Sequence, residues 1–157
     1  MHRTLCLGLA LLCGCAHAAA GGAHVVASAS RDGSAPAWTE SEKAAAVSLK
    51  NLRESPGASF HLLRVRTELP ARMHESSDLV LMLVSGGAEI TLGDRKVPLS
   101  PGDVVEVPEG SVYSVRNRGS QAAVAYLVFS PALSPSDTKL VSQATRESVW
   151  KWNLWLQ

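Results

Sequence analysis

The segment from Pro98 to Asn117 constrains the fold of this chain more than any other stretch. It reads Pro-Leu-Ser-Pro-Gly-Asp-Val-Val-Glu-Val-Pro-Glu-Gly-Ser-Val-Tyr-Ser-Val-Arg-Asn, with two turn sequences that are each followed by a valine-rich run. Proline presets φ for a turn and glycine accepts positive φ, whereas valine favours extended backbone. The segment therefore predicts two short strands, Val104–Val107 and Val112–Val115, each preceded by a tight turn.

The chain on either side repeats this pattern of short strands and turns. Ser59–Thr67 alternates apolar and polar residues, while Leu79–Val84 is a continuous apolar run, which is typical of a strand buried on both faces. Further strands are expected at 88–92, 95–99 and 122–129, separated by glycine-containing turns. Short strands at near-regular spacing without intervening helices predict an all-β barrel.

The spacing within the organising segment resembles the second signature motif of the cupin superfamily. Gly102, Pro108, Gly110 and Asn117 stand at the intervals of that motif, and Tyr113 stands where the family carries a histidine. The resemblance covers residues 59–131 and implies a cupin-type jelly-roll β-barrel, a double-sheet fold.

The first cupin motif carries two histidines and a glutamate, and the matching positions here are Arg72, His74 and Leu79. With Tyr113 these are the positions at which the resemblance implies a metal site, and His74 is the only metal ligand among them. Arginine stays protonated and repels a divalent cation, so we expect no metal cofactor. A guanidinium, an imidazole and a phenol suit a carboxylate or phosphate instead. The sequence therefore predicts a non-catalytic site for a small anionic ligand.

Two other interpretations of these residues remain open. His61 and Asp78 could join His74 in a rearranged site for Fe, Mn, Zn, Ni or Cu, which would make the chain a metal-dependent isomerase or dioxygenase. Alternatively, Arg72 pairs with Glu75 or Asp78 at the rim, His74 is an ordinary core histidine and the chain is a structural envelope protein. No Ser/His/Asp or Cys/His arrangement suggests nucleophilic catalysis.

Residues 1–20 have the features of a signal peptide. Arg3 precedes an apolar run that is too short to span a bilayer. Leu12-Cys13-Gly14-Cys15 resembles a bacterial lipobox and predicts lipidation of Cys15, whereas Ala16-His17-Ala18 offers an ordinary cleavage site. Residues 21–38 are rich in Ala, Gly and Ser and predict a flexible tether. We therefore expect export to a bacterial cell envelope, as a membrane-anchored lipoprotein or as a periplasmic or secreted protein.

Residues 39–157 are expected to form the domain, with 59–131 as its core. Thr39 and Glu42 form a capping-box pattern that predicts a short helix, although the following Val47-Ser48-Leu49 could begin a strand. Residues 139–157 form a tail rich in tryptophan, a residue common at protein contacts and at membrane interfaces. This tail is expected to pack on its own barrel or to contact a partner.

The charge of the chain argues against one class of partner. The formal net charge is +1 and no basic block stands out, so nucleic acid is not an expected partner. Because cupin-like domains are often dimers, the resemblance also implies a homodimer as a candidate assembly.

The lipobox generates a direct test. If Cys15 is lipidated, the full-length chain made in a bacterial host partitions into the detergent phase of a Triton X-114 extract, and Cys15→Ala moves it to the aqueous phase. Cys13→Ala is the matched control and should stay in the detergent phase. An N-terminus at Ala19 in the wild-type chain would instead identify Ala16-His17-Ala18 as the cleavage site.

Overall fold

The computed structural model describes residues 36–142. The expected signal peptide, most of the tether and the tryptophans of the tail lie outside these residues. The described chain contains one short helix and ten strands. Their bounds are α1 Glu40–Ala44, β1 Val47–Ser55, β2 Ala58–Val65, β3 Glu68–His74, β4 Asp78–Ser85, β5 Ala88–Leu92, β6 Arg95–Leu99, β7 Val104–Val107, β8 Tyr113–Asn117, β9 Ala123–Ser130 and β10 Thr138–Leu140.

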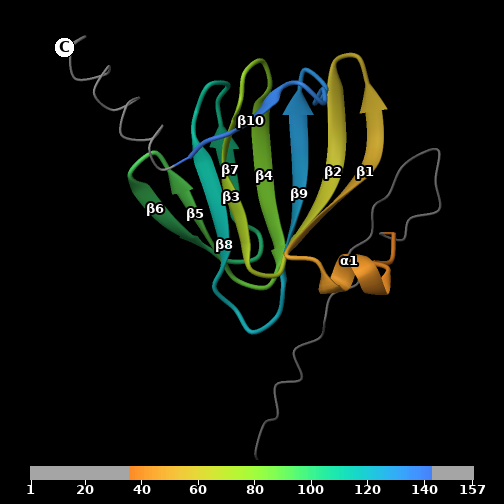
Figure 1. The fold of residues 1–157 in the computed structure, drawn as a ribbon, viewed down its shortest axis with the longest axis vertical. Helices are drawn as coiled ribbons and strands as arrows, with labels where there is room; N and C mark the ends of the chain where they lie inside the picture. The colour runs from red at the N-terminus through yellow and green to blue at the C-terminus, as the bar shows by residue number, and fades with distance from the viewer. Residues whose placement is uncertain (1–35, 143–157) are drawn as a thin grey trace, which may run out of the picture. The chain divides into compact units, whose positions relative to one another are not determined.

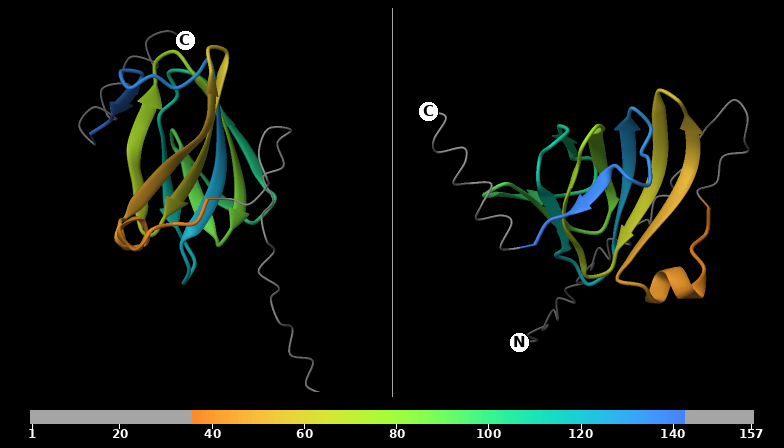
Figure 2. Two further views of the ribbon diagram at one scale, coloured as in Figure 1. Left: turned by 90° about the vertical axis from the view of Figure 1, so that its right-hand side faces the viewer. Right: turned by 45° about the horizontal axis from the view of Figure 1, so that its top comes forward.

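The strands form two five-stranded antiparallel sheets that pack into a jelly-roll barrel (Figures 1 and 2). Sheet I has the order β1-β2-β9-β4-β7, and sheet II has the order β10-β3-β8-β5-β6. The buried core takes alternate residues from both sheets, including Leu81 and Leu127 of sheet I and Ile90 and Val115 of sheet II. The prediction of an all-β cupin-type barrel is therefore confirmed for the described residues.

The turns of the organising segment form as predicted. Gly102 has φ +98° and Gly110 has φ +71°, in the left-handed region that favours glycine. Asp103 closes the first turn, because its amide donates to the carbonyl of Ser100 and its carboxylate accepts from the Ser100 amide. The two strands follow as β7 and β8, with β8 beginning at Tyr113, one residue later than expected.

The prediction that Leu79–Val84 is buried on both faces is wrong. Leu79, Leu81 and Leu83 point into the core, whereas Val80 and Met82 remain 39% and 38% exposed. The run is uniformly apolar, but β4 alternates between a buried and an open face like the rest of sheet I. Sheet I therefore carries apolar side chains on both of its faces.

The two ends of the described chain extend the barrel beyond the expected core of 59–131. The capping box of Thr39 and Glu42 is present, but α1 is only five residues long, and the chain then enters β1 at the edge of sheet I. At the other end, β10 returns to pair with β3 at the edge of sheet II. A turn at residues 135–137 precedes this strand, and sequence reasoning missed the return to the barrel.

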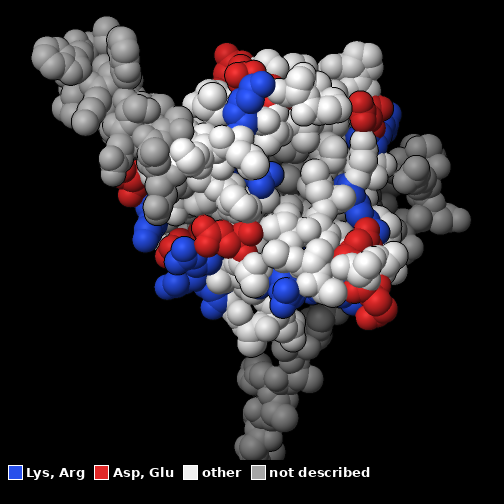
Figure 3. All heavy atoms as spheres, viewed as in Figure 1, with Lys and Arg blue, Asp and Glu red and all other residues white. Residues whose placement is uncertain are grey.

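Charged side chains on the barrel are mixed in sign. On the face drawn in Figure 3, Lys and Arg lie interspersed with Asp and Glu among uncharged residues. The outer face of sheet II includes the ion pairs Arg116–Glu68, at 3.1 Å, and Arg118–Glu89, at 3.9 Å. Within residues 36–142, no helix has the length and apolarity needed to span a membrane.

Gly86 provides a stability test of the barrel. Its φ is +79°, and a Cβ there would lie 2.8 Å from the carbonyl oxygen of Ala122 and 2.9 Å from Cα of Ala123. Gly86→Ala should therefore lower the free energy of unfolding by about 3 kcal/mol, because backbone strain and overpacking add.

The matched control is Gly110→Ala, at φ +71° with nothing within 4 Å of the added Cβ. It should cost only about 1 kcal/mol, which is the strain contribution. Urea unfolding of the full-length variants measures both values. Equal losses would show that the close approach at Gly86 is relieved by movement of the β9 backbone.

Candidate functional site

A polar pair lies inside the otherwise apolar barrel. His74, at the end of β3, and Tyr113, at the start of β8, are 4% and 2% exposed. The imidazole Nε2 lies 2.9 Å from the phenolic oxygen. Tyr113 belongs to the hydrophobic core cluster, so its ring packs among leucine and valine side chains while its hydroxyl reaches the imidazole. The contact between His74 and Tyr113 therefore links the neighbouring strands β3 and β8 of sheet II.

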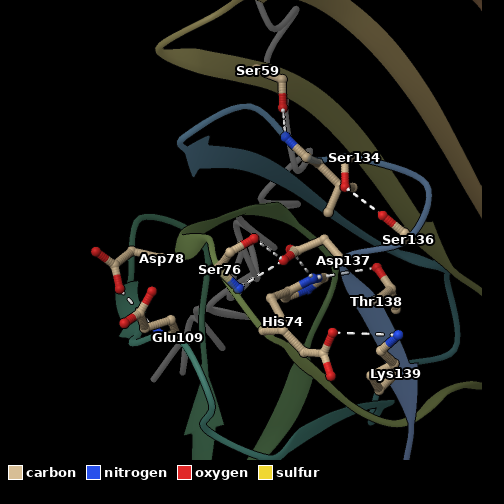
Figure 4. Close-up of polar contacts among 12 residues, drawn as sticks. Ser59, His74, Ser76, Asp78, Glu109, Ser134, Ser136, Asp137, Thr138 and Lys139 are labelled. Carbon is tan, nitrogen blue, oxygen red and sulfur yellow. Dashed lines mark hydrogen bonds and ion pairs between the residues drawn. The ribbon is translucent and has the colours of Figure 1, made fainter.

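The C-terminal strand completes this polar group. Asp137, immediately before β10, places Oδ2 3.3 Å from Nδ1 of His74, and the Thr138 hydroxyl lies at the same distance from that nitrogen. The other carboxylate oxygen, Oδ1, accepts hydrogen bonds from the amide and the hydroxyl of Ser76. Figure 4 shows Asp137 and Thr138 converging on the imidazole. The result is a buried chain of carboxylate, imidazole and phenol: Asp137, His74 and Tyr113.

The surroundings of Asp137 and His74 set their protonation states. Burial lowers the pKa of His74 below 6.5; the Asp137 carboxylate opposes the shift and Arg72 adds to it. Burial alone would raise the pKa of Asp137, but hydrogen bonds from Ser76 and the charge interaction with His74 hold it below 3.8. At neutral pH we therefore assign a carboxylate and a neutral imidazole. In that state Nε2 accepts from Tyr113, and the Nδ1–H faces Oδ2 of Asp137 and the Thr138 hydroxyl, each at 3.3 Å.

Arg72 lies next to the polar chain. It is half-buried, its Cα is paired with that of Tyr113 across β3 and β8, and its Nε donates to the Pro70 carbonyl at 3.1 Å. Its charge acts on both His74 and Tyr113. Burial raises the pKa of Tyr113 to about 12 despite this nearby cation, so the phenol is neutral at physiological pH.

The other predicted site residues add no polar atom to this group. Leu79 is completely buried in the core, whereas Asp78 is exposed and accepts a hydrogen bond from the Glu109 amide. Glu75, expected as a rim partner of Arg72, is paired instead with Lys139 at 3.3 Å.

His61 is buried and points into the barrel. Its Nε2 lies 2.9 Å from the Ser59 hydroxyl. The Phe129 ring contacts both histidines, with centroid distances of 5.4 Å to His61 and 4.8 Å to His74. His61, His74 and Asp78 therefore do not converge on one point.

The donor set does not fit the metal that the fold family implies. Nε2 of His74 is bonded to Tyr113 and Nδ1 faces Asp137 and Thr138, so neither nitrogen offers an uncommitted lone pair. Among residues 36–142, no three His, Cys, Asp or Glu side chains are grouped so as to hold a metal ion. The half-buried Arg72 adds repulsion. We derive no metal chemistry from this site.

Sequence reasoning missed Asp137 and Thr138 as members of the site. Both lie more than 60 positions from His74 in the chain, and they reach it only because β10 pairs with β3. The available signal was a lone acidic residue, Asp137, between the turn sequence Ser134-Pro135-Ser136 and a threonine, and that signal does not point to an interior position.

Residues 60–129 match the sequence model of the cupin domain family. This match runs from within β2 to within β9 and contains both motif regions. The barrel contains a cupin domain. An uncharacterized protein of Aquifex aeolicus is 29% identical over 92 residues, which are 59% of this chain and 75% of that protein.

Solved cupin-like structures show the same fold at low sequence identity. The Streptomyces nucleoside dehydratase Pac13 is 19% identical with a TM-score of 0.55, over 61% of this chain and 78% of that one. KdgF from Halomonas is 23% identical with a TM-score of 0.52, over 55% and 79% of the two chains. A double-stranded β-helix protein from Klebsiella pneumoniae is 18% identical with a TM-score of 0.56, over 62% and 85%.

The raised pKa of Tyr113 generates a prediction about alkaline stability. Below pH 10 the phenol is neutral in both the folded and the unfolded chain. Between pH 10 and about 12 only the unfolded chain releases the proton. The wild-type chain should therefore lose on the order of 2 kcal/mol of stability across this range.

Tyr113→Phe should remove most of this alkaline loss. It should also cost about 1–3 kcal/mol at pH 7, because His74 Nε2 loses its buried partner. The control, Tyr126→Phe, should keep most of the alkaline slope. Denaturant unfolding of the full-length chain at pH 7, 10 and 11.5 measures these differences. An unchanged slope in Tyr113→Phe would contradict the buried neutral phenol.

Proposed function

We propose that this chain is an exported, non-catalytic cupin-domain protein that binds a small anionic molecule through Arg72 and the chain of Asp137, His74 and Tyr113. The observation that carries the proposal is this polar chain inside an apolar barrel. Replacing a buried polar network with packed apolar residues is often neutral or stabilising. A buried carboxylate, imidazole and phenol together with a half-buried guanidinium therefore favour a role beyond stability.

The chemistry of the group suggests the type of ligand. In the assigned protonation state the Tyr113 hydroxyl donates to His74, which leaves its oxygen lone pairs for a donor on the ligand, such as a hydroxyl group. Arg72 supplies a fixed positive charge that acts on both His74 and Tyr113. Guanidinium pairs well with carboxylate and phosphate. A hydroxylated carboxylate or phosphate matches both features.

A second candidate is a metal-independent acid–base enzyme. Aspartate, histidine and tyrosine in close polar contact can pass a proton; here His74 and Tyr113 share a hydrogen bond and Asp137 lies 3.3 Å from the imidazole. Among the fold neighbours are a nucleoside dehydratase and its uridine complexes with a tyrosine replaced by phenylalanine or a histidine by glutamine. General acids and bases work best with a pKa near the operating pH. A Tyr113 pKa of about 12 therefore favours binding over proton transfer.

The remaining candidates rest on other evidence. A metal-dependent isomerase or dioxygenase would require rearranged ligands, and the hydrogen bonds of His74 disfavour that candidate. A protein partner for residues 139–157 and a purely structural envelope role are the alternatives if no small molecule binds. Attachment to a membrane depends on lipidation of Cys15.

The binding proposal is tested by thermal shift and calorimetry on the full-length chain with matched neutral and anionic compounds. The pairs are glucose with glucuronate, and uridine with uridine 5′-monophosphate, with inorganic phosphate added as the simplest anion. At 100 times its dissociation constant, a bound anion stabilises the fold by about 2.7 kcal/mol, which is a shift of several degrees. We expect such a shift for at least one anion and little for its neutral partner.

Two variants assign the effect to the site. Arg72→Gln should weaken binding of the active anion at least about 10-fold, since it removes a charge-assisted contact. Arg116→Gln, on the outer face of sheet II, is the matched control and should bind like wild type. Absence of a shift with every anion, or equal shifts for both members of each pair, would count against the proposal. Turnover of any bound compound would favour the enzyme.

A further inference from the structure

One row of residues on the inner face of sheet II contains two cations. The strand pairings place one residue from each strand of this sheet side by side: Leu140 of β10, Arg72 of β3, Tyr113 of β8, Leu92 of β5 and Arg95 of β6. Residues directly paired across antiparallel strands share a face. Tyr113 belongs to the hydrophobic core and Leu92 packs against it, so the row lies on the side of sheet II that faces the interior.

The alternation along β6 supports this direction for Arg95. Val97 packs against the core and Leu99 is buried in it, whereas Lys96 and Pro98 are exposed. Residues i, i+2 and i+4 of a strand line one face, so Arg95 shares the face of Val97 and Leu99. Arg95 is itself exposed, as the first residue of the edge strand β6. It therefore stands at the solvent-exposed edge of the face that carries Tyr113.

Neither cation of this row is neutralised by a carboxylate within residues 36–142. Arg72 and Arg95 form no ion pair there, although Asp94 directly precedes Arg95. The hydrogen bond of Arg72 joins its Nε to the Pro70 carbonyl and uses neither of its terminal amino groups. An unpaired arginine at the surface is ordinary, but burying a charge without a counter-charge is costly. The half-buried Arg72 is therefore suited to an anion from outside the described chain.

The spacing of the two cations indicates which kind of anion would meet both. Three strand spacings of ~4.8 Å separate the Cα atoms of Arg72 and Arg95 by about 14 Å. The bond to Pro70 holds the Arg72 guanidinium beside β3, so the two cations do not converge on one point. Two separate anionic groups match this arrangement better than one. The part of such a molecule that links them would lie over Tyr113 and Leu92.

We propose that Arg95 is a second anion-binding residue of the site, and that the ligand is a hydroxylated molecule with an anionic group at each of two ends. This inference rests on the proposed function, in which Arg72 holds the first anionic group. Arg95 holds the second group at the edge of sheet II, and it thereby selects two-ended anions over one-ended anions. Because Arg95 is exposed and its contact is screened by solvent, the selectivity should be about 10-fold rather than larger.

Isothermal titration calorimetry of the full-length chain tests this inference with sugar acids that share a six-carbon hydroxylated chain. Gluconate has one carboxylate, and glucarate has a carboxylate at each end. A third compound, 6-phosphogluconate, has a carboxylate at one end and a phosphate at the other. At equal ionic strength, we expect both two-ended anions to bind about 10-fold more tightly than gluconate.

Two adjacent residues of β6 provide a matched pair of variants. Arg95→Gln should abolish the advantage of the two-ended anions, so that glucarate and gluconate bind alike. Lys96→Gln removes the same charge one position along the strand, on the outer face beside Thr91, and should keep the advantage. Urea unfolding verifies that both variants are folded.

The outcomes distinguish failure of this inference from failure of the proposed function. Arg72→Gln should weaken binding of all three sugar acids. If it does so while Arg95→Gln keeps the glucarate advantage, or while Lys96→Gln loses it equally, the role of Arg95 is overturned and the proposed function stands. Two-ended anions that bind no more tightly than gluconate to the wild-type chain also overturn that role. Failure of every anion to bind, inorganic phosphate included, overturns the proposed function with it.

Discussion

The alternation of side chains along the antiparallel strands is the constraint on which the rest of this structure depends. Each strand contributes every second residue to the space between sheets I and II, and those residues form one continuous core. Because a one-residue shift would turn a whole strand inside out, the buried leucines of β4 fix its register against β9 and β7. The same alternation decides which residues can reach the interior polar chain, which consists of Asp137, His74 and Tyr113.

The residues of the interior polar chain come together only because strands that are far apart in the sequence pair with one another. Tyr113 comes from β8, His74 from β3 and Asp137 from the residue before β10, and these strands are neighbours in sheet II. Oδ1 of Asp137 accepts two hydrogen bonds from Ser76, and Oδ2 faces the imidazole at 3.3 Å. A buried anion with this many donors stays ionised, whereas the phenol at the other end stays neutral. The interior polar chain therefore has a fixed negative charge at Asp137 and a neutral hydroxyl at Tyr113.

The sequence predicted the fold wherever the signal was local. The turns at Gly102 and Gly110 and the strands beside them follow from residue types within a few positions of one another. His61 lies on the buried face of β2 together with Leu63 and Val65, as alternation along a strand requires. By contrast, the link between Asp137 and His74 depends on a strand pairing across more than 60 residues, and no short pattern encodes it. The open face of β4 was missed because an apolar run looks the same whether its outer face is buried within the domain or available to a partner.

Two departures from the usual pattern of the fold have a common physical meaning. The substitution of Tyr113 for the family's histidine places a hydroxyl where a ligand nitrogen would be, and this hydroxyl occupies the lone pair of His74 that a metal would need. Val80 and Met82 place apolar side chains where a water-facing sheet would carry polar ones. Neither change weakens the core, because alternation keeps the inner faces intact. A barrel held by its inner faces can therefore change its interior site and its outer surface independently, and in this chain both have diverged from what the fold alone requires.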